Sequence, residues 1–164
     1  MSLTIRPALD SDCRYVYNLS QSVRQWSTRT EAFTYEQHVE WWARRFGPES
    51  NQRWWIAEHD GVQVGYVRYG RIVPDEFHTE AQDAAEVSIA IEPSKQTKGI
   101  GKELLRETMP LAVQWLKVRR LYALVLFDNR RSHRLFKACG FQYDAIEQRL
   151  ERMHIRYVWV APLG

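Results

Sequence analysis

The sequence predicts an α/β chain of the α+β kind, with a mixed, mostly antiparallel central sheet covered by helices. Two observations lead to this prediction. Strand and helix patterns alternate through the centre of the chain, over residues 86–138, and further strand patterns flank that centre on both sides. The 164 residues, 45% of them hydrophobic and 26% charged, suit one domain with its own core, so residues 1–164 are expected to form a single domain.

The first part of the chain predicts a strand, two helices and a hairpin. Thr34 is a residue type that caps helices, and apolar residues repeat at helical spacing after it. Asp60-Gly61 stands between two strand patterns, which is a strong signal for a tight hairpin turn. The expected elements are a strand at residues 3–6, a helix that starts at Asp10, a helix at 34–46, and strands at 53–58 and 62–69.

The second part predicts the strand–helix–strand–helix centre and two final strands. An irregular acidic loop at residues 73–83 precedes it. Pro110 lies inside the longest helical pattern and is expected to kink that helix, because proline has no N–H donor. Gly140 is expected to end the next helix. The expected elements are a strand at 86–91, a helix at 99–117, a strand at 121–127, a helix at 129–138, and strands at 141–145 and 153–161.

Composition and charge exclude several classes of function. The net charge is only +3, which does not call for a nucleic-acid partner. No apolar run is long enough to span a membrane and no secretion signal is seen, so a cytoplasmic protein without a membrane partner is expected. Cys13 and Cys139 lack the spacing of a metal cluster, and no metal is expected.

A loop with two glycines follows the strand expected at residues 86–91. Its sequence, QTKGIG at residues 96–101, leads directly into a helix. Glycines allow a backbone to approach an anion closely, and the N–H groups and positive dipole of a helix start favour phosphate. The loop is neither a Walker loop nor a dinucleotide fingerprint, so a plain helix start with solvated lysines is the alternative interpretation. The lysines that would add positive charge here are Lys95, Lys98 and Lys102.

These residues resemble the GNAT family of acetyl-CoA-dependent N-acetyltransferases. The loop matches that family's pattern Gln/Arg-x-x-Gly-x-Gly/Ala, and a second motif, Asn-x-x-Ser-x-x-Leu-Phe-x-x-x-Gly-Phe, occupies residues 129–141. The resemblance implies a sheet splayed between two central strands, with acetyl-CoA as co-substrate in the gap and residues 84–145 as the core that binds it. The cofactor contacts it implies are Ile89, Ala90, Ile91, Gln96, Thr97, Lys98, Gly99, Ile100, Gly101, Lys102, Asn129, Ser132 and Phe136.

The expected reaction is attack of an amine on the thioester carbonyl. Glu86 is the candidate base, acting directly or through water, and the alternative is a surface or salt-bridged glutamate. A backbone N–H near Ile89 could stabilise the oxyanion. Many members of the family carry, at the position of Phe136, a tyrosine that protonates the leaving thiolate, which phenylalanine cannot do. The replacements that the residues leave open are Tyr122, Tyr143, Cys139 and a water molecule.

The first half, residues 1–75, is expected to shape the acceptor pocket. Its patterns Asn-x-x-x-x-x-Arg-x-Trp-Ser and Glu-x-His-x-x-Trp resemble a GNAT branch that acetylates amino groups of nucleotide-linked sugars, as in pseudaminic acid biosynthesis. Trp26 or Trp41 could stack on a sugar or base, and Arg24 or Arg68 could pair with a diphosphate. Trp41 as helix core and Arg24 as a solvated charge are the alternatives. The candidate acceptor residues are Asn18, Arg24, Trp26, Ser27, His38, Trp41 and Arg68.

Several acceptors therefore stay open. The first expectation is the amino group of a nucleotide-linked or surface-polysaccharide amino sugar, with a small-molecule amine as the partner. Other acceptors of the same reaction are a protein N-terminus, an aminoglycoside or a polyamine, and the acidic loop at residues 73–83 favours the last. A non-catalytic acyl-CoA-binding regulatory module is the alternative of another class, suggested by Phe136. The exposed final strands could also pair in a homodimer.

Overall fold

The computed structural model describes residues 3–28, 30–72, 83–96 and 98–163. The α-helices are α1 (Cys13–Ser22), α2 (Tyr35–Arg45), α3 (Ile100–Leu116) and α4 (Arg130–Ala138), with short 3-10 helices at Asp10–Asp12, Arg24–Trp26 and Pro93–Lys95. The strands are β1 (Leu3–Pro7), β2 (Gln52–His59), β3 (Val62–Arg71), β4 (Ala84–Ile91), β5 (Arg120–Leu126), β6 (Gln142–Arg149) and β7 (Arg152–Val160).

These strands form one seven-stranded sheet in the order β1-β2-β3-β4-β5-β7-β6. Within it β4 and β5 are parallel, and the other neighbouring pairs are antiparallel. This arrangement confirms the predicted fold class. Parallel neighbours need a crossover connection, which α3 provides, so α3 and α4 both start where these two strands end. No helix in the described ranges is long and apolar enough to cross a membrane.

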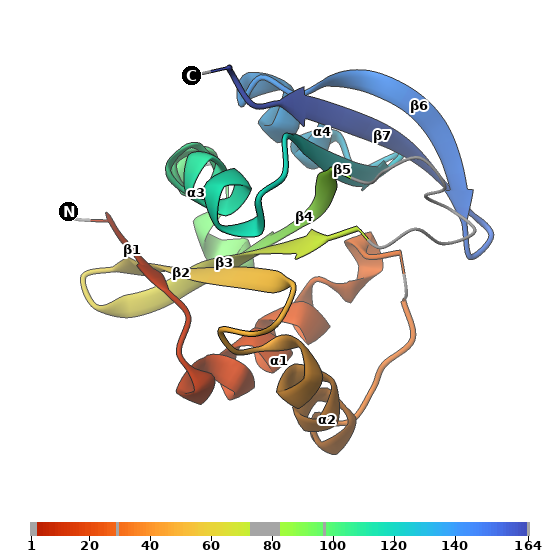
Figure 1. Ribbon diagram of the computed structural model, residues 1–164. Coiled ribbons are helices and arrows are strands. Elements are labelled where there is room, and N and C mark those ends of the chain that lie inside the picture. The colour runs from red at the N-terminus through yellow and green to blue at the C-terminus, as the bar shows by residue number, and fades with distance from the viewer. Residues whose placement is uncertain (1–2, 29, 73–82, 97, 164) are drawn as a thin grey trace.

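Helices cover both faces of the sheet (Figure 1). On one face α1 and α2 bury Val16, Leu19 and Trp42 against Trp54 of β2. On the other face α3 and α4 form the larger core, in which Leu104 and other α3 residues meet the central strands. The hairpin of β6 and β7 curves over toward the segment that follows α1 (Figure 1). The face with α1 and α2 therefore lies beside that hairpin.

The predicted helix cap and hairpin turn are confirmed. Thr34 Oγ1 accepts a hydrogen bond from the Gln37 N–H at 3.1 Å, and the Gln37 side chain accepts one from the Thr34 N–H at 2.8 Å, which is a capping box. Asp60 and Gly61 turn the chain between β2 and β3 with φ angles of 51° and 81°. Helix α3 runs across Pro110 as one helix, so the proline does not interrupt it.

The final hairpin is longer than predicted. The strand expected at residues 141–145 continues as β6 to Arg149, and the chain then turns through Leu150 and Glu151 with φ angles of 46° and 65°. Turns of this kind normally carry glycine, asparagine or aspartate. Because neither residue is of that type, the sequence contains no signal for this turn.

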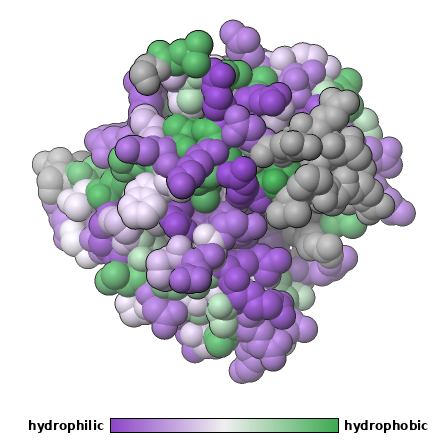
Figure 2. Space-filling model, in the orientation of Figure 1, coloured by the Kyte–Doolittle hydropathy of each residue, from purple (hydrophilic) through white to green (hydrophobic). Residues whose placement is uncertain are grey.

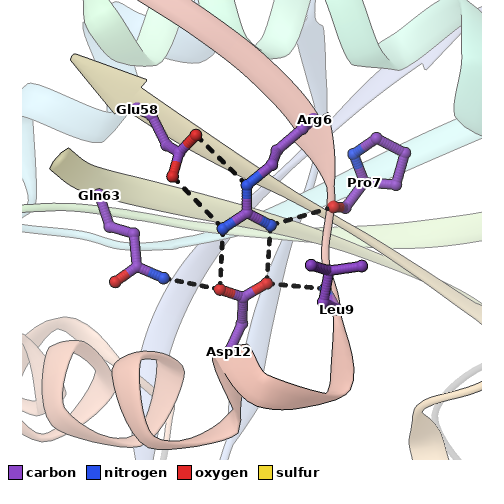
Figure 3. A network of polar contacts seen from close by, with 6 residues as sticks. All are labelled: Arg6, Pro7, Leu9, Asp12, Glu58 and Gln63. Atoms are coloured by element: carbon purple, nitrogen blue, oxygen red, sulfur yellow. Dashed lines mark hydrogen bonds and ion pairs between the residues drawn. The ribbon is translucent and has the colours of Figure 1, made fainter. Parts of the chain in front are cut away.

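An ion-pair network fixes the start of α1 against the sheet (Figure 3). Arg6 of β1 donates two hydrogen bonds to the buried Asp12, at 2.8 and 3.0 Å, and pairs with Glu58 of β2 at 3.3 Å. The Gln63 side chain and the Leu9 N–H also donate to Asp12, at 2.6 and 2.7 Å. Burial by itself would raise the pKa of Asp12, but these hydrogen bonds and the Arg6 charge outweigh it and hold the pKa below its ordinary value.

Candidate active site

The sheet opens between its two parallel strands. Strand β4 pairs with β5 only through Ala84, Ala85 and Glu86, although β4 stays paired with β3 as far as Ile91. From Val87 onward, β4 therefore has no strand neighbour on its β5 side among the residues that the structure describes. The helices α3 and α4 start beyond these diverging ends, and helix starts present N–H donors and positive partial charge. The opening can therefore bind an anionic ligand along an unpaired strand edge.

The loop that leads into α3 has a defined shape at both of its ends. The Gln96 side-chain amide donates to the Ile91 carbonyl at 3.0 Å and so ties the loop to the end of β4. Gly99 is the N-cap of α3 with φ 81°, a left-handed conformation that favours glycine. Lys98 beside it is exposed and Lys102 in the first helical turn is partly buried. Thr97, which was expected at the cofactor site, lies outside the described residues.

A close contact holds the start of α3 against α4. A side-chain carbon added at Gly101 would lie 3.3 Å from Leu135 of α4 and 3.7 Å from Ile91 of β4, so glycine permits this approach. Asn129 caps α4, since its Oδ1 accepts a hydrogen bond from the Ser132 N–H at 3.3 Å. Residues 99–101 and 129–132, far apart in sequence, thus form the starts of the two helices that follow β4 and β5.

Phe136 lies inside the core and not on an open surface. Its side chain is 4% exposed and meets Phe141 edge-to-face at 5.1 Å. Of the residues that could replace the missing tyrosine, Cys139 is also buried, which raises the pKa of its thiol, while Tyr143 is exposed on β6. Tyr122 stands directly opposite Glu86 in the pairing of β4 with β5. The structure therefore brings only Tyr122 of these three to the point where the strands part.

Glu86 occupies that same point, because it is the last β4 residue paired with β5. Its carboxylate is partly exposed and lies 3.4 Å from the guanidinium of Arg149 on β6. Arg149 also pairs with Glu147 at 3.5 Å. Glu86 is therefore salt-bridged, as the alternative interpretation of this residue expected. The pair places the cation of Arg149 beside the candidate base.

Arg68 of β3 lies next to Glu86 on the face covered by α1 and α2. Its guanidinium donates to Ser88 Oγ at 3.1 Å and to Gln52 Oε1 at 3.4 Å. It also lies 5.5 Å from the ring centre of Trp41 and 5.6 Å from that of Trp54. The structure thus brings together two of the predicted acceptor residues, Arg68 and Trp41.

The other acceptor candidates lie on α1 and in the segment that follows it. Asn18 is exposed on α1, and Arg24, Trp26 and Ser27 are exposed in the segment that follows it. Arg152 of β7 donates to the Ser27 carbonyl at 2.7 Å, which attaches this segment to the final hairpin. These four residues therefore border the space between α1 and the β6–β7 hairpin, without a contact to Arg68 or Trp41 in the described structure.

His38 is buried among aromatic rings. Its side chain is 2% exposed, and neither ring nitrogen makes a hydrogen bond to any residue in the described ranges. Burial lowers the pKa of His38, and the nearby Cys13 backbone offsets part of this effect. The rings around it, at centroid distances between 5.4 and 6.5 Å, are Tyr17, Phe33, Tyr35, Trp41 and Trp42. His38 supports the packing of α2 and does not face an acceptor in this structure.

Changing His38 to phenylalanine is expected to reduce the loss of stability in acid. A histidine whose pKa is lowered by folding destabilises the fold as the pH falls from about 6.5, its value in the unfolded chain, through the folded pKa. Phenylalanine does not titrate, so the free energy of unfolding of the variant should change less than that of the wild type between pH 8 and pH 5. Urea unfolding at both pH values measures this, and equal changes in the two proteins would contradict it.

Two side chains near Glu86 and Arg68 were missed by sequence reasoning. Arg149 reaches Glu86 only because β6 continues past the predicted end, through a turn that carries no sequence signal. Arg45 of α2 lies 5.0 Å from the Trp41 ring centre. This contact could have been predicted, because residues four positions apart on a helix are neighbours on its surface.

Comparison with known proteins agrees with this geometry. The sequence profile of the acetyltransferase (GNAT) family matches residues 14–141. YwnH of Bacillus subtilis strain 168, provisionally named a phosphinothricin acetyltransferase, is 30% identical over 147 residues, which cover 85% of this chain and 83% of YwnH. The chain belongs to the acetyltransferase (GNAT) family. It is accordingly an acetyl-CoA-dependent N-acetyltransferase, as the sequence predicted.

Solved structures with low sequence identity share the fold. The Salmonella typhimurium protein yncA, described as a provisional acetyltransferase with its cofactor acetyl-CoA, aligns with a TM-score of 0.82 at 18% identity, over 100% of this chain and 96% of its own. Spermidine N-acetyltransferase from Vibrio cholerae, in complex with CoA and spermine, aligns with a TM-score of 0.79 at 19% identity, over 96% and 95% of the two chains.

Proposed function

We propose that this protein transfers the acetyl group of acetyl-CoA to the primary amine of a small molecule, with Glu86 as the base. The observation that carries the proposal is the position of Glu86 at the point where β4 and β5 part, beside an opening bordered by two helix starts. In this proposal the chain works as one domain, in which residues 84–145 bind the cofactor and residues 1–75 shape the acceptor site.

The residues around the opening fit acetyl-CoA. The N–H groups at the start of α3, with Lys98 and Lys102, suit a pyrophosphate. The β4 edge from Ile89 to Ile91 has no strand on the β5 side, so its backbone groups suit an amide-bearing arm that adds to the sheet. Asn129 and Ser132 stand at the start of α4 on the other side of the opening. Bound acetyl-CoA supplies an activated acetyl group as a thioester.

The chain's own groups then provide the proton transfers. Glu86 removes a proton from the acceptor ammonium, directly or through one water, because an amine attacks only in its neutral form. A backbone N–H near Ile89 on the open edge donates to the developing oxyanion. Tyr122, opposite Glu86, is the candidate donor to the leaving sulfur in place of the absent tyrosine. A thiol pKa of about 8.5 makes such help modest, since the thiolate leaves tolerably well unaided.

An amino sugar linked to a nucleotide is the first candidate acceptor. The supporting observation is that Trp41, which belongs to the sequence pattern, and Arg68, the other candidate for a diphosphate contact, lie together beside Glu86 on the same face. A planar guanidinium suits a diphosphate and an indole suits a sugar or base. YwnH and the spermidine enzyme carry names that point to other acceptors, so an amino-acid analogue or a polyamine belongs in the same assay.

Replacing Lys98 and Lys102 together with glutamine is expected to weaken acetyl-CoA binding by about tenfold or more, because charge-assisted hydrogen bonds to phosphate would be lost. Calorimetric titration with acetyl-CoA measures the affinity. The control is Lys117→Gln at the opposite end of α3, which should bind as the wild type does. No binding by the wild type at high micromolar acetyl-CoA would overturn the proposal. Binding without thiol release from any amine would indicate a regulatory module.

A further inference from the structure

Two arginines lie against one tryptophan beside the candidate acceptor site. The Arg45 guanidinium of α2 is 5.0 Å from the ring centre of Trp41, and the Arg68 guanidinium of β3 is 5.5 Å from the same centre. Both arginines are partly buried. Arg68 is also 5.6 Å from the ring of Trp54, so indole surfaces border it on two sides. Two guanidinium groups thus lie against one indole ring.

Neither arginine of this pair contacts a carboxylate directly in the described structure, although the charge of Glu86 acts on Arg68. The oxygens that Arg68 contacts, Ser88 Oγ and Gln52 Oε1, are both neutral. Among the residues the structure describes, no carboxylate forms an ion pair with Arg45 or Arg68. Most of the guanidinium donors of these two side chains are therefore available to a ligand.

Three other partly buried arginines are paired with carboxylates, whereas Arg53 and Arg152 donate to backbone carbonyls. Arg6 contacts Asp12 and Glu58, and Arg149 contacts Glu86 and Glu147. Arg156 contacts Asp144 at 2.7 Å. The pair at Trp41 differs from this pattern, although a cation removed from water is costly without a counter-charge.

The electrostatics of the pair increase that cost. Burial lowers the pKa of Arg68, and the negative charge of nearby Glu86 only partly offsets it. Burial also lowers the pKa of Arg45, and the positive charges of Arg68 and Arg44 lower it further. Both groups stay protonated because arginine ionises far above physiological pH. A bound anion would offset both the cost of burying these two cations and the repulsion between them.

We propose that Arg45 and Arg68, seated on Trp41, bind an anionic group of the acceptor, so that the acceptor is an amine that also carries a carboxylate or a phosphate. This inference rests on the proposed function, because it assigns the acceptor class of the same site. Ser88, which Arg68 contacts, is two residues along β4 from Glu86 and on the same face. At about 3.3 Å per residue, the anion and the reacting amine would lie roughly 7 Å apart.

The two positive charges of Arg45 and Arg68 suit an anionic acceptor more than a polycation. On the face of the molecule shown in Figure 2, hydrophobic residues form separate patches among hydrophilic ones. A polyamine would place a second positive charge against Arg45 and Arg68, and like charges in a partly buried site repel strongly. The proposal therefore excludes polyamines as preferred acceptors, although related folds bind them.

The test compares matched amines that differ in one anionic group. Thiol release from acetyl-CoA is measured with glucosamine and glucosamine 6-phosphate, with 5-aminopentanamide and 5-aminopentanoate, and with spermidine. The wild type is expected to favour the anionic member of a pair by at least roughly tenfold in kcat/KM, as a charge-assisted bidentate contact would give. The phosphate and carboxylate pairs show which anion the site prefers. Spermidine as the best substrate would overturn the proposal.

Variants test the two arginines themselves. Arg68→Gln and Arg45→Gln should each raise KM for the anionic amine about tenfold or more, with little change for its neutral counterpart or for acetyl-CoA. Arg68→Lys keeps the charge but loses the planar fork, so an intermediate KM is expected. Arg44→Gln, at the neighbouring exposed position of α2, is the control and should keep the wild-type preference. Unchanged selectivity in both glutamine variants would contradict the proposal.

A binding measurement keeps the two proposals separable. With the cofactor loop occupied by saturating CoA, inorganic phosphate should raise the melting temperature of the wild type and change its tryptophan fluorescence, and it should do neither in the Arg45→Gln/Arg68→Gln double variant. If phosphate binds in this way but no amine is acetylated, the anion site stands and the proposed function fails. If amines are acetylated without an anion preference and phosphate has no effect, the proposed function stands and the anion site fails.

Discussion

Replacing Glu86 with glutamine is expected to lower kcat at pH 7 by roughly 10²–10⁴-fold, the usual contribution of a positioned general base. The acceptor amine is mostly charged at this pH: with a pKa of about 8, as for an α-amino group, about one molecule in ten is neutral, and with a pKa of about 10, as for an alkyl ammonium, about one in a thousand. Without a base, the enzyme would depend on that neutral fraction. The defect should therefore shrink as the pH is raised toward 9.5, and steady-state kinetics over this range measure it.

Glu147→Gln is the matched control for this variant. Glu147 shares Arg149 with Glu86, at 3.5 and 3.4 Å, but it lies on β6 and not where β4 and β5 part. Loss of a partner of Arg149 therefore occurs in both variants, whereas loss of the base occurs only in Glu86→Gln. Equal and pH-independent losses in the two variants would show that Glu86 acts through Arg149 and not as a base. Acetyl-CoA affinity should stay unchanged in both.

The local structure of the proposed cofactor segments could be predicted from the sequence because their residues are close together along the chain. Gln96, Gly99 and Gly101 lie within one loop whose shape depends on local features, a left-handed glycine and a helix start. Asn129 at the next helix start is likewise a local cap. Short-range rules of backbone conformation are sufficient to recognise such segments, and the parallel arrangement of β4 and β5 then brings them together.

The acceptor side could be predicted only in part, because it depends on contacts between distant segments. Arg45 and Arg68 meet at Trp41 only after β3 and α2 pack on one another. Arg149 reaches Glu86 through a hairpin turn at Leu150-Glu151 that has no sequence signal. His38 fits a motif in sequence, yet the packing of five rings buries it. Spacing along the chain does not determine which side chains a tertiary contact covers.

Replacing Asp12 with alanine is expected to lower the free energy of unfolding by about 3–5 kcal/mol, the usual cost of breaking a buried ion pair from one side. The change removes the ion pair of the partly buried Arg6 with Asp12 and leaves its ion pair with Glu58. It also removes the oxygens that accept hydrogen bonds from the Gln63 side chain and the Leu9 N–H. Urea unfolding at pH 7 measures the effect. Ser11→Ala, at the neighbouring exposed position, is the control and should change stability little.

The pH dependence distinguishes this ion pair from simple loss of packing. The pKa of Asp12 is lowered in the fold, so its contribution is present above the unfolded value of about 3.9 and is lost as the pH falls through the folded pKa. The difference in stability between the wild type and Asp12→Ala should therefore narrow below pH 4. A difference that stays constant down to pH 2 would contradict the ionic origin.

The same change should also raise KM for the acceptor more than KM for acetyl-CoA. Asp12 immediately precedes α1, and α1 covers the acceptor face of the sheet, whereas the cofactor loop lies beyond the end of β4.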